Sequence, residues 1–159
     1  MNGSKSYERQ VTFELANVGS GPDSVDAATL AETYEDAIVV LLGSHYCSRS
    51  RELVRTLRDH YGAFRERGTA VVPVLPAIHE RARLWDERYD LPFPLLVDPG
   101  PDGEFEVFEP LRGACDMLPA VVLCDCTPRG LRVVSTLSET NTSVPTIGTM
   151  LDRIDDQRF

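Results

Sequence analysis

The sequence lacks any apolar run near the ~20 residues that a membrane-spanning helix requires. Its first residues also lack the apolar core of a secretory signal. We therefore expect a cytoplasmic protein, in which cysteines stay reduced. Lysine is almost absent, since only Lys5 among the 16 basic residues is lysine, and the net charge is −9. A chain this acidic offers no basic face to nucleic acid, so we expect no nucleic-acid partner and no membrane partner.

The shortage of lysine accompanies an excess of acidic residues, 25 in all. This composition is typical of proteins adapted to a high-salt cytoplasm, where screening weakens the repulsion between surface charges. It predicts a halophilic, haloarchaeal-type host, although GC-rich coding alone also explains arginine in place of lysine. Histidine is scarce too: there are three, and none has ligand spacing to a cysteine. We therefore expect neither a metal nor another cofactor.

A chain of 159 residues, 42% of them hydrophobic, is long enough for one domain with its own core. We expect a flexible tail at residues 1–8 and a single domain over residues 9–159. Apolar β-branched runs alternate with helical periods. The expected strands are 11–15, 37–42, 70–75, 95–97, 120–124 and 131–135, and the expected helices are 26–35, 47–67, 78–89 and 145–156, with one further turn near Glu106. This order predicts an α/β fold, a sheet flanked by helices.

Cys47 stands between the end of the apolar strand 37–42 and the start of the helix that follows. Unpaired backbone N–H groups and the positive end of the helix dipole stabilise a thiolate at such a junction, and Arg49 adds a positive charge nearby. Because the thiolate is the nucleophilic form of cysteine, Cys47 is the candidate catalytic residue. The alternative is a small buried apolar side chain.

Three polar residues flank Cys47. Ser44 is expected to donate to the thiolate or to cap the helix, and Ser50 to donate to the sulfur. His45 is a candidate proton donor, or otherwise a solvent-facing loop residue. Ser50 also occupies the fourth position of a Cys-x-x-Cys motif, where a dithiol protein has its second cysteine. Cys47 alone can attack a disulfide but cannot release itself, so a second thiol is required.

Three further cysteines lie in the C-terminal third of the chain. Cys115 is the candidate resolving thiol if its loop approaches Cys47, and otherwise an incidental loop cysteine. Cys124 and Cys126 are predicted to point to opposite faces of one strand and so to be poor disulfide partners.

Three motifs extend from Cys47 to Pro99: the strand–loop–cysteine–helix junction, the run 61–64 before the strand 71–75, and the run 85–99, which reads WDERYDLPFPLLVDP. Together they resemble the redoxin group, the peroxiredoxin (AhpC/TSA) and thioredoxin-like proteins. The resemblance implies a thioredoxin-like fold with a mixed sheet. It also implies that Pro119, in the run 117–123, is the cis-proline that opens a strand in contact with the active thiol.

The chain departs from the peroxiredoxin pattern at two positions. In the signature Pro-x-x-x-Thr-x-x-Cys, Cys47 matches the cysteine and Ser44 conservatively matches the threonine, but Val40 replaces the proline. The arginine that polarises peroxide in that family falls about where this chain has Leu118. Arg112 is the candidate replacement if its loop folds back.

We therefore predict an oxidoreductase with a single active cysteine in the pattern Cys-x-x-Ser. Cys47 would react with a protein or low-molecular-weight disulfide, or with a peroxide in an antioxidant role, and an external thiol reductant would restore it. The alternative belongs to another class: a redox-inactive thioredoxin-fold binding module that holds a partner's extended strand beside Pro119. A homodimer is compatible with both hypotheses.

Overall fold

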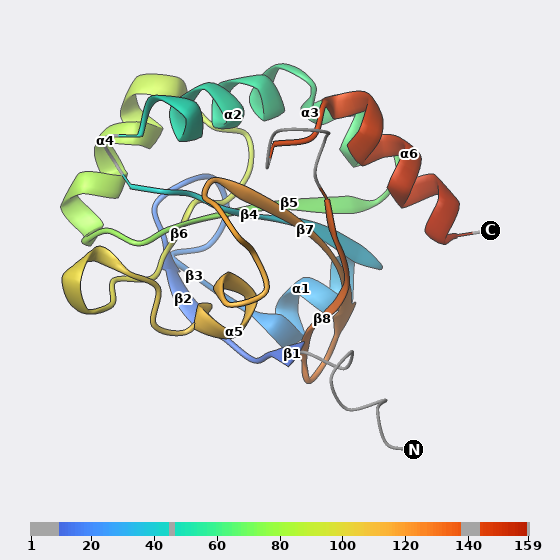
Figure 1. The fold of residues 1–159 in the computed structure, drawn as a ribbon, viewed down its shortest axis with the longest axis horizontal. Coiled ribbons are helices and arrows are strands. Elements are labelled where there is room, and N and C mark those ends of the chain that lie inside the picture. Colours follow the sequence, from blue (N-terminus) through green and yellow to red (C-terminus); the bar gives the residue numbers. More distant parts are fainter. Residues whose placement is uncertain (1–9, 45–46, 138–143, 159) are drawn as a thin grey trace.

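The strands form one mixed sheet with helices against both faces (Figure 1). The computed structural model describes residues 10–44, 47–137 and 144–158, so the predicted tail lies outside the described residues. In chain order the elements are β1 (Gln10–Val11), β2 (Glu14–Asn17), β3 (Ser24–Asp26), α1 (Ala27–Thr33), β4 (Asp36–Leu41), α2 (Ser48–Asp59), α3 (Tyr61–Glu66), β5 (Thr69–Leu75), α4 (His79–Tyr89), β6 (Leu96–Val97), the 3-10 turn η2 (Pro101–Gly103), α5 (Glu109–Arg112), β7 (Ala120–Thr127), β8 (Gly130–Leu137) and α6 (Ile147–Gln157). None of the described helices is long and apolar enough to cross a bilayer.

Strand β4 lies at the centre of the sheet, whose order is β1-β8-β7-β4-β5-β6-β2-β3. It pairs in parallel with β5 and antiparallel with β7. All six of its residues are buried because both faces of the sheet are covered. The predicted α/β architecture with a mixed sheet and flanking helices is confirmed.

Two apolar clusters occupy the two faces of the sheet, because successive side chains of a strand alternate between faces. Helices α2, α3, α4 and α6 cover the first cluster, and α1 and α5 lie on the other face (Figure 1). In β4, Ile38 and Val40 belong to the first cluster, whereas Val39 and Leu41 belong to the second. Trp85 of α4 is buried in the first cluster with Leu57 of α2 and Ile154 of α6, so these three helices are fixed to one face.

The predicted strand 11–15 is two strands at opposite ends of the sheet. Val11 of β1 pairs with β8, whereas Ala16 of β2 pairs with β6. The alternation itself is correct, since Val11, Phe13 and Leu15 are all buried in the second cluster. The chain crosses that face of the sheet between the two pairings, which the alternation cannot reveal.

The predicted helix 47–67 is interrupted at His60, whose backbone leaves the helical region with φ −116° and ψ 16°. The Thr56 carbonyl oxygen still accepts from the His60 backbone N–H at 3.2 Å, and the His60 ring nitrogen Nδ1 lies 2.9 Å from the same oxygen. Helix α3 then turns so that Phe64 is fully buried in the first cluster.

The helical turn predicted near Glu106 begins three residues later, as α5 (Glu109–Arg112). Glu106 lies outside helices, between η2 and α5. Its backbone N–H donates to the carboxylate of the buried Asp98, which also accepts from the N–H groups of Val107 and Phe108 at 2.9 and 2.8 Å. Asp98 therefore holds residues 106–108 in a tight turn directly before α5, and the Phe108 side chain packs in the second cluster.

Candidate active site

Cys47 is the N-cap residue of α2, at the edge of the sheet where β4 ends. Its Sγ accepts a hydrogen bond from the backbone N–H of Ser50 at 3.4 Å, and its own N–H donates to the Ser44 carbonyl at 3.2 Å. The side chain is partly buried. The strand–loop–helix junction that the sequence predicts is present, and it places the sulfur at the positive end of a twelve-residue helix.

Ser50 and Gly43 complete the surroundings of the sulfur. The Ser50 side chain is fully buried, and its Oγ accepts a hydrogen bond from the Gly43 N–H at 2.8 Å. A Cβ at Gly43 would lie 3.3 Å from the Cys47 Sγ and 3.5 Å from the Ser50 Oγ. A larger residue at this position would therefore crowd the Cys47 sulfur, whereas glycine leaves it room. Gly43 escaped the sequence reasoning, although a glycine directly after an apolar strand is a recognisable signal of close approach.

The pKa of the Cys47 thiol is lowered from its ordinary value. Partial burial raises it, but that effect is outweighed by hydrogen bonding from the Ser50 side chain, by the backbone N–H groups of Ser50 and Arg49, and by the charge of Arg49. Helix α2 has no acidic residue in its first turn, so no nearby negative charge there raises the Cys47 pKa. A larger fraction of Cys47 is thus thiolate near neutral pH than of an ordinary cysteine.

Pro119 follows a cis peptide bond after Leu118, as predicted. Ala120 pairs with Leu41, so this proline lies at the level of the residues that lead from β4 to Gly43. The register therefore brings the start of β7 beside the Cys47 loop. A direct contact between Pro119 and Cys47 stays a prediction.

Cys124 and Cys126 share a face of β7, which corrects the prediction that they point apart. Residues two apart in a strand lie on the same side, and both side chains pack in the second cluster. No disulfide joins them. Burial raises the pKa of Cys126 to about 12 with help from the charges of Asp36 and Asp125, and burial raises that of Cys124 even further. Both are protonated thiols at neutral pH and poor nucleophiles.

Cys115 and Arg112 are tied to each other in the segment after α5. The Arg112 guanidinium donates to the Cys115 carbonyl at 2.8 Å, and the Cys115 thiol donates to the Leu111 carbonyl at 3.4 Å. Cys115 packs against the second cluster, whereas α2 packs on the first. The roles predicted for these two residues stay predictions, and His45 lies outside the described residues.

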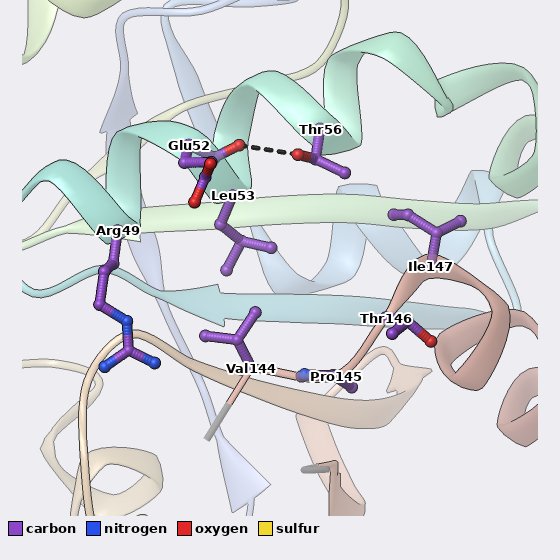
Figure 2. Close-up of a pocket in the computed structure, with 8 residues that line it drawn as sticks. All are labelled: Arg49, Glu52, Leu53, Thr56, Val144, Pro145, Thr146 and Ile147. Atoms are coloured by element: carbon purple, nitrogen blue, oxygen red, sulfur yellow. Dashed lines mark hydrogen bonds between the residues drawn. The ribbon is translucent and has the colours of Figure 1, made fainter. Parts of the chain in front are cut away.

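Shallow grooves surround the N-terminal part of α2. Figure 2 shows one of about 270 Å³ between this helix and the segment that leads into α6, with Arg49 and Leu53 on one side and Val144 and Pro145 on the other. A second lies between α2 and α4 and is lined by Ser48 and several arginines. A third, largely apolar, reaches from Ser44 to Ile78. Within the described ranges, no group of three or more His, Cys, Asp or Glu side chains could hold a metal ion.

The model of the AhpC/TSA family matches residues 10–110 of the chain. Among curated proteins there is no match. The fold is similar to that of peroxidoxin BcpB from Mycobacterium tuberculosis, at 15% identity and a TM-score of 0.72 over 96% of this chain and 98% of that one. It is also similar to that of the reduced 2-Cys peroxiredoxin from Plasmodium vivax, at 16% identity and a TM-score of 0.72 over 95% of each chain. A third similar fold is the thioredoxin domain of a thiol-disulfide oxidoreductase from Bacteroides vulgatus. The identity is 15% and the TM-score 0.65, over 95% of this chain and 96% of that one.

Proposed function

Because the chain belongs to the AhpC/TSA family, for which thiol redox chemistry is the general function, we propose that Cys47 is its single reacting cysteine. The observation that carries this proposal is the Cys47 sulfur at the start of α2, where the Ser50 N–H donates to it and its pKa is lowered. The remaining thiols with a shifted pKa, Cys124 and Cys126, are shifted the other way. Ser44, Ser50, Arg49 and Pro119 are proposed to position and stabilise this thiolate.

With a peroxide, the Cys47 thiolate attacks one oxygen of the O–O bond. The bond breaks, the sulfur becomes a sulfenic acid, and the other oxygen leaves as an alcohol or water after taking a proton. An external thiol then condenses with the sulfenic acid, releasing water and forming a mixed disulfide. A second thiol attacks that disulfide on the external sulfur and restores Cys47.

With a disulfide substrate, the same thiolate attacks one sulfur and expels the other as a thiolate, again leaving a mixed disulfide. Ser50 offers no sulfur for an internal release, and its hydroxyl is already bound to Gly43. Cys115 is the proposed internal alternative. We favour an external thiol, because Cys115 packs against the opposite apolar cluster and bonds there to Leu111.

Peroxide consumption tests the proposal. Wild type supplied with dithiothreitol should consume hydrogen peroxide or an alkyl hydroperoxide, Cys47→Ser should not, and Cys115→Ser should retain the rate. Thiol–disulfide exchange on a small disulfide distinguishes the second reaction. If wild type and Cys47→Ser show equal rates in both assays, Cys47 performs neither.

A redox-inactive binding module is the second candidate. Val40 and Leu118 stand where the peroxiredoxin pattern has its proline and arginine, which removes two groups that assist peroxide reduction. A normal, unreactive Cys47 thiol together with binding of an extended peptide beside Pro119 would favour this function. A cytoplasmic location and a high-salt host complete the proposal and rest on the sequence alone, and a homodimer is compatible with it.

A further inference from the structure

The groove between α2 and α4 is rich in positive charge in a protein that carries −9 overall. Four of its seven lining residues are arginines: Arg49, Arg51 and Arg55 from α2 and Arg88 from α4. Glu52 is the one acidic residue in the lining. An adjoining groove shares Arg51 and Arg88 and adds Arg81, so the basic surface continues along α4.

Among the described residues, three of the groove arginines, Arg51, Arg55 and Arg88, lack the carboxylate partners that other arginines in the protein have. Five arginines elsewhere form ion pairs with carboxylates. Within the described part of the chain, neither Arg51, Arg55 nor Arg88 lies within 4.0 Å of a carboxylate oxygen. Arg51 and Arg55 are also four residues apart on one helix, where like charges repel and weaken the helix. An anion that binds between the two helices would relieve this repulsion and so stabilise the folded protein.

The groove begins at Ser48, the residue directly after Cys47. Its volume of about 420 Å³ suits a small molecule rather than a folded partner. Guanidinium groups bind carboxylates in a bidentate manner, so several arginines around one groove suit a ligand with more than one carboxylate. We propose that this groove binds a polyanionic low-molecular-weight thiol, which acts as the external reductant of Cys47.

The role of the bound thiol as a reductant rests on the proposed function, whereas its binding to the groove can be tested without that function. In the cycle, the bound thiol condenses with the Cys47 sulfenic acid, forms the S–S bond and releases water. The same encounter can be measured without peroxide, by first converting Cys47 to a mixed disulfide with 2-thiopyridine. An incoming thiolate then attacks the Cys47 sulfur, and the pyridine sulfur leaves with the electron pair as pyridinethione, which is followed by absorbance. Peptide mass confirms that the label is on Cys47.

The probes are mercaptosuccinate, which has two carboxylates, and neutral 2-mercaptoethanol, each normalised to its rate with the urea-unfolded labelled protein. Because the net charge of −9 repels anions, a protein without a functional groove should react more slowly with mercaptosuccinate. We expect the folded wild type to favour mercaptosuccinate by on the order of tenfold. Arg51→Gln/Arg55→Gln should remove most of this preference, Arg88→Gln should weaken it from the other helix, and added salt should reduce it.

The control Arg65→Gln/Arg129→Gln removes the same charge from two exposed arginines outside the groove and should keep the preference. Equal loss in both double variants, or no preference in wild type, overturns the proposal. Peroxide oxidation of Cys47 is scored separately: a protein that keeps the preference but forms no sulfenic acid retains the anion groove and loses the proposed function.

Discussion

Cys47 caps helix α2 and Cys124 lies in strand β7, and their surroundings shift the two thiol pKa values in opposite directions. Cys47 caps a helix, and donors from Ser50 and Arg49 outweigh its partial burial. Cys124 of β7 is buried in the second cluster, where the apolar surroundings and the charge of Asp125 oppose ionisation of the thiol. Burial without donors makes a cysteine inert, whereas burial with donors makes it reactive.

Ser50→Ala should raise the Cys47 pKa, because the side-chain hydrogen bond that lowers it is lost. The Gly43 N–H also loses its acceptor, which should reduce the free energy of unfolding by about 1–3 kcal/mol. The measurement is the pH dependence of Cys47 alkylation by iodoacetamide, with chemical denaturation in parallel. Ser48→Ala, at an exposed neighbouring position, is the control and should leave the midpoint in place. An unchanged midpoint in Ser50→Ala would contradict the role given to this side chain.

The buried thiols predict a loss of stability at alkaline pH. An unfolded cysteine ionises near ~8.5, whereas Cys126 in the folded protein has a pKa of about 12 and that of Cys124 is also raised. Their contribution is therefore fully present below pH ~8.5 and is lost as pH rises toward the folded-state pKa. At pH 10 each thiol should lower the free energy of unfolding by about 2 kcal/mol.

Denaturation between pH 8 and 10.5 measures this slope. Cys124→Ala should flatten it, because the variant has one fewer group that ionises only when unfolded. Cys47→Ser is the matched control: the Cys47 pKa is lowered, so its contribution is complete above pH ~8.5 and its removal should leave the alkaline slope unchanged. Equal slopes in wild type and Cys124→Ala would show that the thiol ionises in the folded protein.

At the scale of elements, the site is formed where β4 ends and α2 begins. The strand is held on both sides, by β5 and β7, so its end is fixed. Gly43 then lets the chain turn close to the sulfur, and its N–H holds Ser50 in the first turn of the helix. The position of the sulfur thus depends on the junction as a unit rather than on α2 alone.

Gly43→Ala should slow Cys47 alkylation several-fold, because the added methyl group would lie only 3.3 Å from the Cys47 sulfur, closer than an ordinary contact. Gly62→Ala is its control, since nothing lies within 4 Å of the position a Cβ would take there in α3. Gly62→Ala should leave the rate of Cys47 alkylation unchanged and stabilise helix α3 by up to about 1 kcal/mol. Alkylation rates at fixed pH and thermal unfolding measure both effects. A Gly43→Ala protein that reacts like wild type would show that the junction has spare room.

At the scale of the whole molecule, the C-terminus is fastened to the end of β4 opposite the site. Arg158 pairs with the buried Asp36 at 3.0 Å, and the Thr69 hydroxyl donates to the same carboxylate at 2.7 Å. Helix α6 is thereby held over the first cluster, where Ile154 and Met150 are fully buried. Asp36 and Leu41 stand at the two ends of β4, so five strand steps, roughly 16 Å, separate this ion pair from the site.

Arg158→Ala should lower the free energy of unfolding by about 3 kcal/mol, because it leaves a buried carboxylate without its cation. Cys47 alkylation should stay unchanged, since the site lies at the other end of β4. The exposed Arg153→Ala on the same helix should cost less than about 1 kcal/mol. Arg158→Ala/Asp36→Ala should lose less than the sum of the single changes. Additive losses would mean that the two residues do not interact energetically.

The order of elements and the Cys47 junction could be predicted from sequence because both depend on neighbours along the chain. Apolar periodicity identified β4, α4 and α6, and the helix predicted over 26–35 is α1, whose N-cap Asp26 accepts a hydrogen bond from the Thr29 N–H. The family resemblance added the cis bond before Pro119. The predictions failed where distant contacts decide the course of the chain, as at the crossing from β1 to β2 and in the loop that Asp98 organises.

The sequence by itself determined that one cysteine would start a helix after a buried strand, without a second cysteine in its motif. Only the tertiary structure decided the surroundings of each thiol and therefore its pKa. A pKa depends on burial and on donors in space: Gly43 meets Ser50 across a loop, and Cys124 and Cys126 are enclosed by elements from both halves of the chain. The Asp36–Arg158 pair, 122 residues apart, and the arginine groove between α2 and α4 likewise exist only after folding, because no local pattern records which surfaces will meet.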